Sequence, residues 1–138
     1  MSETDMRSEA TMAKWDVPMY QLGDTGVMKM VKEFARVMGQ EPNPSLSAKL
    51  ITEEYDEWLE EVVYPTSDEA QLKELADLLY VIYGYANVKG WDLDTAVARV
   101  HSNNIGRCIQ PDGSIKRSPE GKILKNPDYE KVELGDLT

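Results

Sequence analysis

Apolar side chains recur every three or four residues in several stretches of the chain, which is the periodicity of amphipathic helices. The first stretch starts near Asp24 and ends at Gly39, a residue type that commonly terminates helices. Its apolar positions are Val27, Met30, Val31, Phe34 and Met38. This spacing predicts a helix with one apolar face, directed toward the rest of the protein.

A second helix is predicted after the turn-forming segment EPNPS. Ser45 and Ser47 are its candidate N-caps, because a serine side chain can accept a hydrogen bond from a free backbone N–H of the first turn. The periodic pattern continues to about Val63, and Pro65 ends it because proline cannot continue a helix. The connection to the next element is therefore short, which favours an antiparallel neighbour.

A third helix is predicted to begin with a capping box, in which Thr66 precedes Glu69 by three residues. It runs to about Val88 and is closed by Gly90. Its second half, LADLLYVIYGYANV, is apolar, aromatic or small apart from a single acid. A helix that is apolar nearly all round is typical of a buried position.

A fourth helix, capped by Asp92, is predicted to extend to about Asn104. After Gly106 the chain becomes rich in proline and glycine and loses helical periodicity, so residues 107–138 are predicted to be an irregular tail with turns and a short hairpin. Residues 1–22 show no clear period and are expected to be a loosely held extension. The expected fold is a single all-α domain over residues 1–138, a small helix bundle with a turn-rich C-terminal tail.

The composition, with 41% hydrophobic and 29% charged residues, is that of a globular protein. No apolar run approaches the roughly 20 residues needed to cross a bilayer, and the polar N-terminus lacks a secretory signal. Cys108 is the single cysteine, so a disulfide within one chain is impossible. These features predict a cytoplasmic protein with no membrane partner.

The formal net charge of -10 disfavours nucleic acid as a partner, because the phosphate backbone repels an acidic surface. The charge is unevenly distributed: residues 41–80 are strongly acidic and residues 99–125 are mostly basic. An acidic centre with a basic tail suits a substrate that is an anion carried on cations, such as a metal-bound phosphate. A random scatter of surface charge is the alternative.

Four carboxylates are spaced so that they can converge. Glu54 and Glu57 lie three residues apart on the second helix, and Glu74 and Asp77 do so on the third. No lysine or arginine lies in the turns that follow Asp77, so we expect no ion pair within that helix. If the two helices pack antiparallel, the four oxygen donors form a hard site suited to Mg²⁺ or Mn²⁺. The alternative is an ordinary solvated helix face.

These residues also carry a resemblance. The segments EEYDE and ELAD resemble the EExxE…ExxD signature of the all-α nucleoside triphosphate pyrophosphohydrolases, which include MazG-like proteins, phosphoribosyl-ATP pyrophosphohydrolases and dimeric dUTPases. The segments HSNNIGR and EGKILKNPDY are similar to the phosphoribosyl-ATP branch, and the resemblance covers about residues 24–134. One departure is Arg107, where this branch often has lysine, and the change affects phosphate geometry.

The resemblance implies a four- to five-helix bundle and cleavage of a nucleoside triphosphate between its α and β phosphates, giving a monophosphate and diphosphate. It implies that divalent cations are held by Glu54, Glu57, Glu74 and Asp77. It further implies that Glu53 is another ligand or the base that activates water, and that the substrate is bound by Asn104, Arg107, Lys122 and Lys125. Asn103 is a weaker candidate for the same role. Relatives form oligomers, so a homo-oligomer is expected, a tetramer rather than a dimer.

Three other interpretations compete with this resemblance. A ferritin-like di-iron protein needs Glu-x-x-His pairs, and the one histidine, His101, has Ala98 at the required position. A non-enzymatic acidic interaction module accounts for the net charge but leaves Glu74 and Asp77 unexplained within an apolar helix. A third alternative keeps the fold and takes phosphoribosyl-ATP as substrate. No residue specifies the base, and the resemblance alone favours a purine nucleotide such as (d)GTP.

Overall fold

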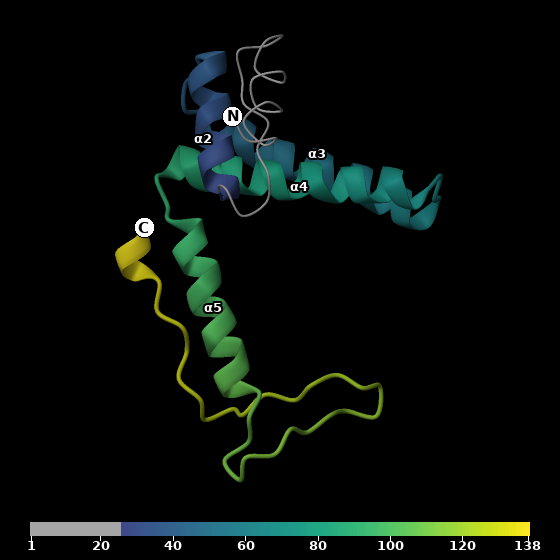
Figure 1. Cartoon of the computed structure of the whole chain (residues 1–138), viewed down its shortest axis with the longest axis vertical. Helices are drawn as coiled ribbons and strands as arrows, with labels where there is room; N and C mark the ends of the chain where they lie inside the picture. Colours follow the sequence, from purple (N-terminus) through teal and green to yellow (C-terminus); the bar gives the residue numbers. More distant parts are fainter. Residues whose placement is uncertain (1–25) are drawn as a thin grey trace, which may run out of the picture.

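The computed structural model describes residues 26–138. Its helices, in chain order, are α2 (Val27–Met38), α3 (Pro44–Val63), α4 (Asp68–Lys89), α5 (Leu93–Arg107) and the short 3₁₀-helix η1 (Gly135–Leu137). The regular structure of this part of the chain is thus helical, which confirms the all-α prediction (Figure 1). The predicted extension over residues 1–22 and the predicted helix start near Asp24 lie outside the described residues.

Two glycines and an aspartate bound the helices as the sequence predicts. Gly39 (φ 60°) and Gly90 (φ 73°) follow α2 and α4 in the left-handed conformation, which glycine adopts without a steric cost. Asp92 caps α5 by accepting a hydrogen bond from a backbone N–H of the first turn. The helix α5 then continues past its predicted end at Asn104 as far as Arg107.

The predicted N-cap of α3 is wrong. The helix starts at Pro44, and the side chain of Asn43 accepts a hydrogen bond from the backbone N–H of Leu46 at 3.1 Å. Proline is well suited to the first helical position, because the N–H that it lacks would have no partner there. Ser45 and Ser47 therefore lie inside the helix rather than at its cap.

The predicted capping box of α4 is also wrong by one residue. Ser67, not Thr66, is the N-cap, and its hydroxyl accepts a hydrogen bond from the backbone N–H of Ala70 at 3.0 Å. Thr66 instead donates its hydroxyl (2.9 Å) and its backbone N–H (3.1 Å) to the carboxylate of Glu61, near the end of α3. These bonds tie the α3–α4 connection to the helix that precedes it.

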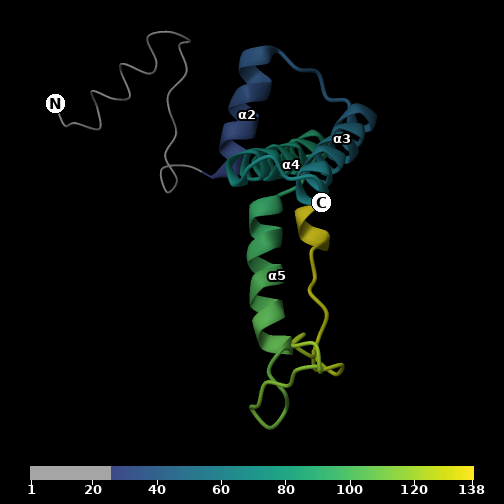
Figure 2. The ribbon, with the colours of Figure 1, turned by 90° about the vertical axis from the view of Figure 1, so that its right-hand side faces the viewer.

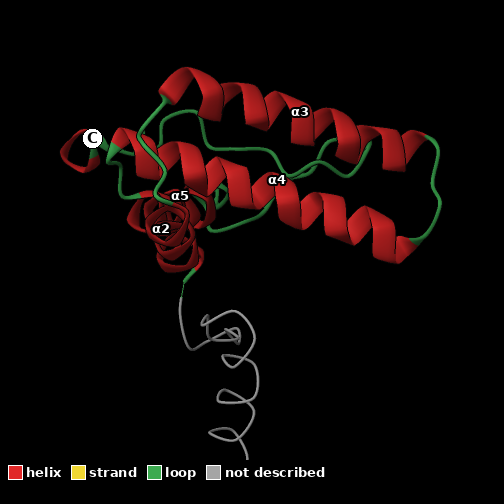
Figure 3. Ribbon diagram, turned by 90° about the horizontal axis from the view of Figure 1, so that it is seen from above, coloured by secondary structure: helices red, strands yellow, loops and turns green. Residues whose placement is uncertain are grey.

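Helices α3 and α4 lie side by side in antiparallel directions, and α2 packs across α4 (Figure 3). The buried residues of this arrangement are Met28 and Val31 from α2 and Tyr83 and Ala86 from α4. The hydroxyl of Tyr83 donates a hydrogen bond of 3.0 Å to the carboxylate of Asp94, which connects this small core to the start of α5.

Helix α5 leads away from the α3–α4 pair, and the C-terminal tail returns along it (Figures 1 and 2). Arg99 on α5 donates to both carboxylate oxygens of Asp136, at 2.6 and 2.9 Å. The side-chain amide of Asn103 donates to the backbone carbonyl of Glu130 at 2.8 Å. The tail is irregular, as predicted, and its hairpin is a single bridge between Arg117 and Ile123.

In a single chain, α4 is less buried than its composition suggests. Leu72, Leu75 and Leu79 are exposed to 66%, 47% and 47% of their surface, because α3 and α2 cover only part of the helix. The expectation of a fully buried helix is therefore wrong for the isolated chain. No helix in residues 26–138 combines the length and the apolarity that crossing a bilayer would require.

The tail depends on a close approach to α5 that glycine permits. A Cβ atom at Gly106 would overlap the hydroxyl of Tyr129, whereas one at Gly84, inside α4, would meet nothing within 4 Å. We expect Gly106→Ala to displace Tyr129 and to raise amide hydrogen exchange over residues 126–137 about tenfold, equivalent to ~1.4 kcal/mol of local opening. The control Gly84→Ala should leave the tail protected and keep or raise stability, by up to ~1 kcal/mol. Unchanged exchange in Gly106→Ala would show that the Tyr129 contact does not hold the tail.

Candidate metal centre

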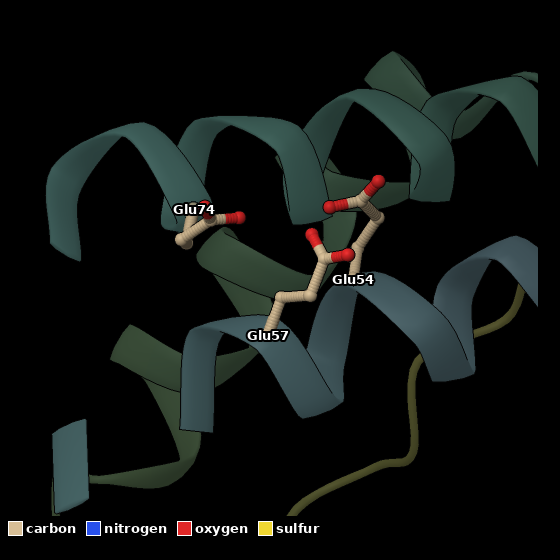
Figure 4. A group of neighbouring side chains, drawn as sticks. All are labelled: Glu54, Glu57 and Glu74. Carbon is tan, nitrogen blue, oxygen red and sulfur yellow. The ribbon is translucent and has the colours of Figure 1, made fainter. Parts of the chain in front are cut away.

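Three carboxylates converge between the antiparallel helices α3 and α4. Glu54 and Glu57 come from successive turns of α3, and Glu74 comes from the second turn of α4 (Figure 4). Each contributes an oxygen, and these oxygens all lie within 4.8 Å of one another. The structure therefore brings together three of the four residues that the sequence suggested as metal ligands.

The cluster has features that suit a cation. Oε2 of Glu54 and Oε2 of Glu74 are buried from solvent and have no hydrogen-bond donor. Burial, in the first place, raises the pKa of Glu54 above its ordinary value of 4.5, and a hydrogen bond with Glu57 and the negative charges of Glu57, Asp77 and Glu74 raise it further. Buried acceptors without donors are costly, and a hard divalent cation offers them the ligand chemistry they prefer. These residues fit such an ion.

Asp77 lies next to the cluster and has a partner that the sequence argument missed. Its Oδ2 is 2.6 Å from Nζ of Lys73, which also lies 3.7 Å from Oε1 of Glu74. The expectation that no ion pair forms within this helix is therefore wrong. It considered only the turns after Asp77, whereas Lys73 precedes it by four residues on the same helix face.

Glu53, the candidate base, lies outside the cluster. Its side chain is half exposed, and its nearest cation is Lys49 at 4.0 Å, one turn earlier on α3. Because neighbouring helical residues point about 100° apart, Glu53 is directed away from the position that Glu54 occupies. Its role in activating water stays a prediction.

The predicted substrate-binding residues lie far along α5 and in the tail. Asn104 and Arg107 belong to the last turns of α5, and the exposed Lys122 and Lys125 follow in the tail. Nε of Arg107 is buried without a hydrogen-bond acceptor. Figures 1 and 2 both show this end of α5 leading away from α3 and α4. Within one chain, the structure does not bring these residues to the carboxylates.

Asn103, the weaker substrate-binding candidate, holds the tail on α5. Its side-chain amide donates to the backbone carbonyl of Glu130. The C-terminal segment could not be positioned from sequence, because its register on α5 depends on contacts made about thirty residues apart. An asparagine that holds backbone cannot at the same time offer that N–H to a ligand.

A groove of about 630 Å³ lies beside the carboxylates, and sequence reasoning did not identify it. It is bounded by α2, the start of α3 and the second half of α4. The residues that line it include Phe34, Gln40, Leu46, Leu50, Tyr80, Val81 and Asn87. Leu50 is one turn before Glu54, and Tyr80 is one turn after Asp77, so the groove continues the face that carries the acids.

Tyr80 and Tyr83 have different environments. Both lie in the apolar second half of α4, which the sequence predicts to be buried. Tyr83 is buried in the core, as expected. Tyr80 is half-buried, lines the groove and packs edge-to-face on Phe34, with ring centroids 5.9 Å apart. The signal that could have suggested a groove next to the acids is the single change along each helix, from apolar to acidic turns on α3 and from acidic to apolar turns on α4.

An all-α chain whose antiparallel helix pair carries convergent carboxylates has the architecture of the MazG-like pyrophosphohydrolases. Comparison with protein families agrees: residues 31–104 match the model of the phosphoribosyl-ATP pyrophosphohydrolase family, and the chain belongs to that family. It is therefore a pyrophosphohydrolase of this superfamily. The match includes every candidate carboxylate and ends at Asn104, before Arg107 and the tail lysines. A search of curated proteins gave no match.

The pKa of Glu54 predicts how stability should depend on pH. Below its ordinary pKa of 4.5, Glu54 is protonated in both folded and unfolded chains and costs nothing. As the pH rises through its raised folded-state pKa, a charge is forced into the cluster and the metal-free fold loses stability. Mg²⁺ should therefore raise the melting temperature more at about pH 8 than at about pH 5, since protons and metal compete for the same oxygens. Thermal unfolding with Mg²⁺ and with a chelator checks this, and an equal effect at both pH values would contradict it.

Proposed function

We propose that this protein is a metal-dependent nucleoside triphosphate pyrophosphohydrolase. In this reaction water adds across the anhydride bond between the α and β phosphates of a (d)NTP, and the products are a nucleoside monophosphate and diphosphate. The observation that carries the proposal is the convergence of Glu54, Glu57 and Glu74 between α3 and α4, with two buried oxygens that lack donors. Because its substrate would come from the nucleotide pool, we place the enzyme in the cytoplasm.

The acids of α3 and α4 have two proposed roles, metal binding and acceptance of a proton from water. Glu54, Glu57, Glu74 and Asp77 would hold Mg²⁺ or Mn²⁺, which would neutralise charge at the phosphates and lower the pKa of bound water. Glu53 is the candidate group that accepts the proton from the attacking water. For this its carboxylate must leave the exposed pair with Lys49, which costs little because such surface pairs contribute about 0–1 kcal/mol.

The groove beside the carboxylates is the proposed site of the nucleoside. Its lining combines the rings of Phe34 and Tyr80 with leucine side chains and the amides of Gln40 and Asn87. Apolar walls with a few polar groups are typical of small-molecule sites, and the volume of about 630 Å³ lies in their usual range. A purine such as that of (d)GTP is the base we propose, and the amides offer donors and acceptors to its edge.

Phosphoribosyl-ATP is the second candidate substrate, because the matched family is named for its hydrolysis. It carries the same triphosphate, so the carboxylates would act in the same way. The difference would lie in the groove, which would have to admit a base that carries an additional ribose phosphate.

Pyrophosphate release across the common NTPs, dNTPs and phosphoribosyl-ATP, with Mg²⁺, with Mn²⁺ and with a chelator, tests the proposal. We expect release with metal only. Glu57→Gln should lower kcat/KM by more than about 100-fold, because even residues behind a metal ligand typically contribute 10–100-fold. Glu60→Gln, an exposed position on the same helix, is the matched control and should retain activity. Full activity in Glu57→Gln would exclude the metal assignment, and release from no nucleotide would favour the acidic binding module.

We also propose that the active enzyme is a homo-oligomer, a tetramer rather than a dimer. In the described part of one chain, the buried hydrophobic core consists of four residues, which is small for a chain of this length. Large apolar side chains stay exposed on α4 and on α5, where Val97 and Ile105 are exposed to 52% and 54%. Exposed apolar stripes on several helices are typical of surfaces that another subunit covers. Helix α5, which leads away from the α3–α4 pair, offers such a surface (Figure 1).

An oligomer would also complete the proposed site. In one chain, the tail segment that carries Lys122 and Lys125 follows the end of α5 that lies away from α3 and α4 (Figures 1 and 2). The backbone N–H of Asn126 donates to the carbonyl of Arg107 there, at 2.6 Å. A triphosphate that spans metal and cations would therefore use carboxylates from one subunit and tail lysines from another. Arg107, at the end of the same helix, would approach the phosphates together with the tail.

Mixing two inactive variants tests this arrangement. A Glu57→Ala chain co-expressed with a Lys122→Ala/Lys125→Ala chain should recover about a quarter of wild-type activity, because random pairing gives that share of sites an intact half from each subunit. Glu57→Ala mixed with Asp77→Ala should recover nothing, since both changes fall in the same half-site. If the first mixture is no more active than its separate components, the lysines act within their own chain or not at all.

A further inference from the structure

A cation from the same chain, the ammonium group of Lys73, lies beside the carboxylate cluster. In the described part of the chain, the ion pairs made by the cluster and Asp77 are those of Lys73, with Asp77 at 2.6 Å and with Glu74 at 3.7 Å. Its side chain is 66% exposed, so the ammonium group reaches the acids from the solvent side of the helix pair. The proposed function leaves this lysine without a role.

The ion pair of Lys73 with Asp77 contributes little to the stability of α4. A lysine four residues before an acid is the less favourable order of the pair, and exposed pairs of this kind contribute only about 0.3–0.5 kcal/mol. The hydrogen bond to Asp77 and then the charges of Asp77, Glu74 and Glu54 raise the pKa of Lys73. The lysine is therefore held by the field of acids from both helices, and not only by its neighbour on α4.

Lys73 and a divalent cation would compete for the same place. Nζ of Lys73 is bonded to Oδ2 of Asp77, one of the oxygens proposed to hold metal. A positive charge that stays this close would repel the incoming ion. The side chain can move away, because it is exposed and its four-carbon stem is flexible. Lysine is also a common partner of phosphate oxygens, which it meets as a point charge.

We infer that Lys73 is a displaceable counter-ion, which neutralises Asp77 and Glu74 when no metal is bound and turns to the polyphosphate of the substrate when metal takes its place. This inference rests on the proposed function, since it assumes that the carboxylates bind a divalent cation. It assigns Lys73 to both states of the site, as a positioning residue for the acids and as a phosphate contact.

Mn²⁺ titration of the intact protein without nucleotide, followed by electron paramagnetic resonance, tests the first half. Lys73→Met keeps the aliphatic stem and removes the charge, and we expect it to bind Mn²⁺ about three- to tenfold more tightly, as loss of a unit charge a few ångströms away implies. Lys49→Met is the matched control, because Lys49 forms an exposed i,i+4 pair with Glu53 at 4.0 Å. Its Mn²⁺ affinity should stay within about twofold of wild type.

Binding of inorganic triphosphate to the Mg²⁺-saturated protein tests the second half. Lys73→Met should weaken this binding about three- to tenfold, the effect of losing one charge-assisted contact, while Lys49→Met should not. The two measurements therefore move in opposite directions for the same substitution, which a merely structural role would not produce.

The outcomes are distinguishable. If the wild type binds Mn²⁺ and Lys73→Met binds it equally or more weakly, this inference is overturned and the proposed function stays intact. Tighter Mn²⁺ binding with unchanged triphosphate affinity would overturn the phosphate contact. Absence of Mn²⁺ binding by wild type would overturn both the inference and the metal-dependent function on which it rests.

Discussion

Repulsion between like charges is the constraint around which the α3–α4 pair is built. Glu54, Glu57 and Glu74 each place an oxygen within 4.8 Å of the others. Burial and the negative charges around it raise the pKa of Glu54. Two oxygens of the cluster lack donors, so the metal-free arrangement is electrostatically unfavourable. Packing of the apolar positions on both helices brings the acids together nevertheless. Replacing the acids would stabilise a helix pair that had no other task, and the proposed binding of a cation would offset the cost of keeping them.

The same register also determines what lies on either side of the acids. On α3, Leu46 and Leu50 lie in the turns before the acids. On α4, Tyr80 and Val81 lie in the turns after the acids, and these four residues line the groove. Toward the α3–α4 connection, Glu61 bonds to Thr66 and closes the turn. Apolar turns, acidic turns and the connecting turn thus follow one another along the helix pair. A bound nucleotide would lie along this axis, with its nucleoside at the apolar turns and its phosphates at the acids.

Much of this arrangement could be predicted from the sequence, because it depends on local pattern. Helical periodicity, Gly39, Gly90 and Asp92 gave the elements and three of their ends. The errors came from competition between neighbours: Asn43 with Pro44 offered a better helix start than the serines that follow. The ion pair of Lys73 was missed because the search for partners went in one direction along the helix. The groove could not be predicted, since the position of α2 across α4 depends on packing between distant segments.

Helix α5 and its tail have features that a single chain does not explain. The sequence predicts the helix and its basic tail, and Arg99 and Asn103 explain how the tail is held along it. Neither explains why α5 and the tail carry the cations away from the acids that they are proposed to serve. The apolar side chains that α5 exposes are unfavourable in water unless another surface covers them. A second copy of the chain would offer both an apolar surface and a carboxylate cluster. The self-association proposed above would therefore cover the exposed side of α5 and bring the tail cations to the acids.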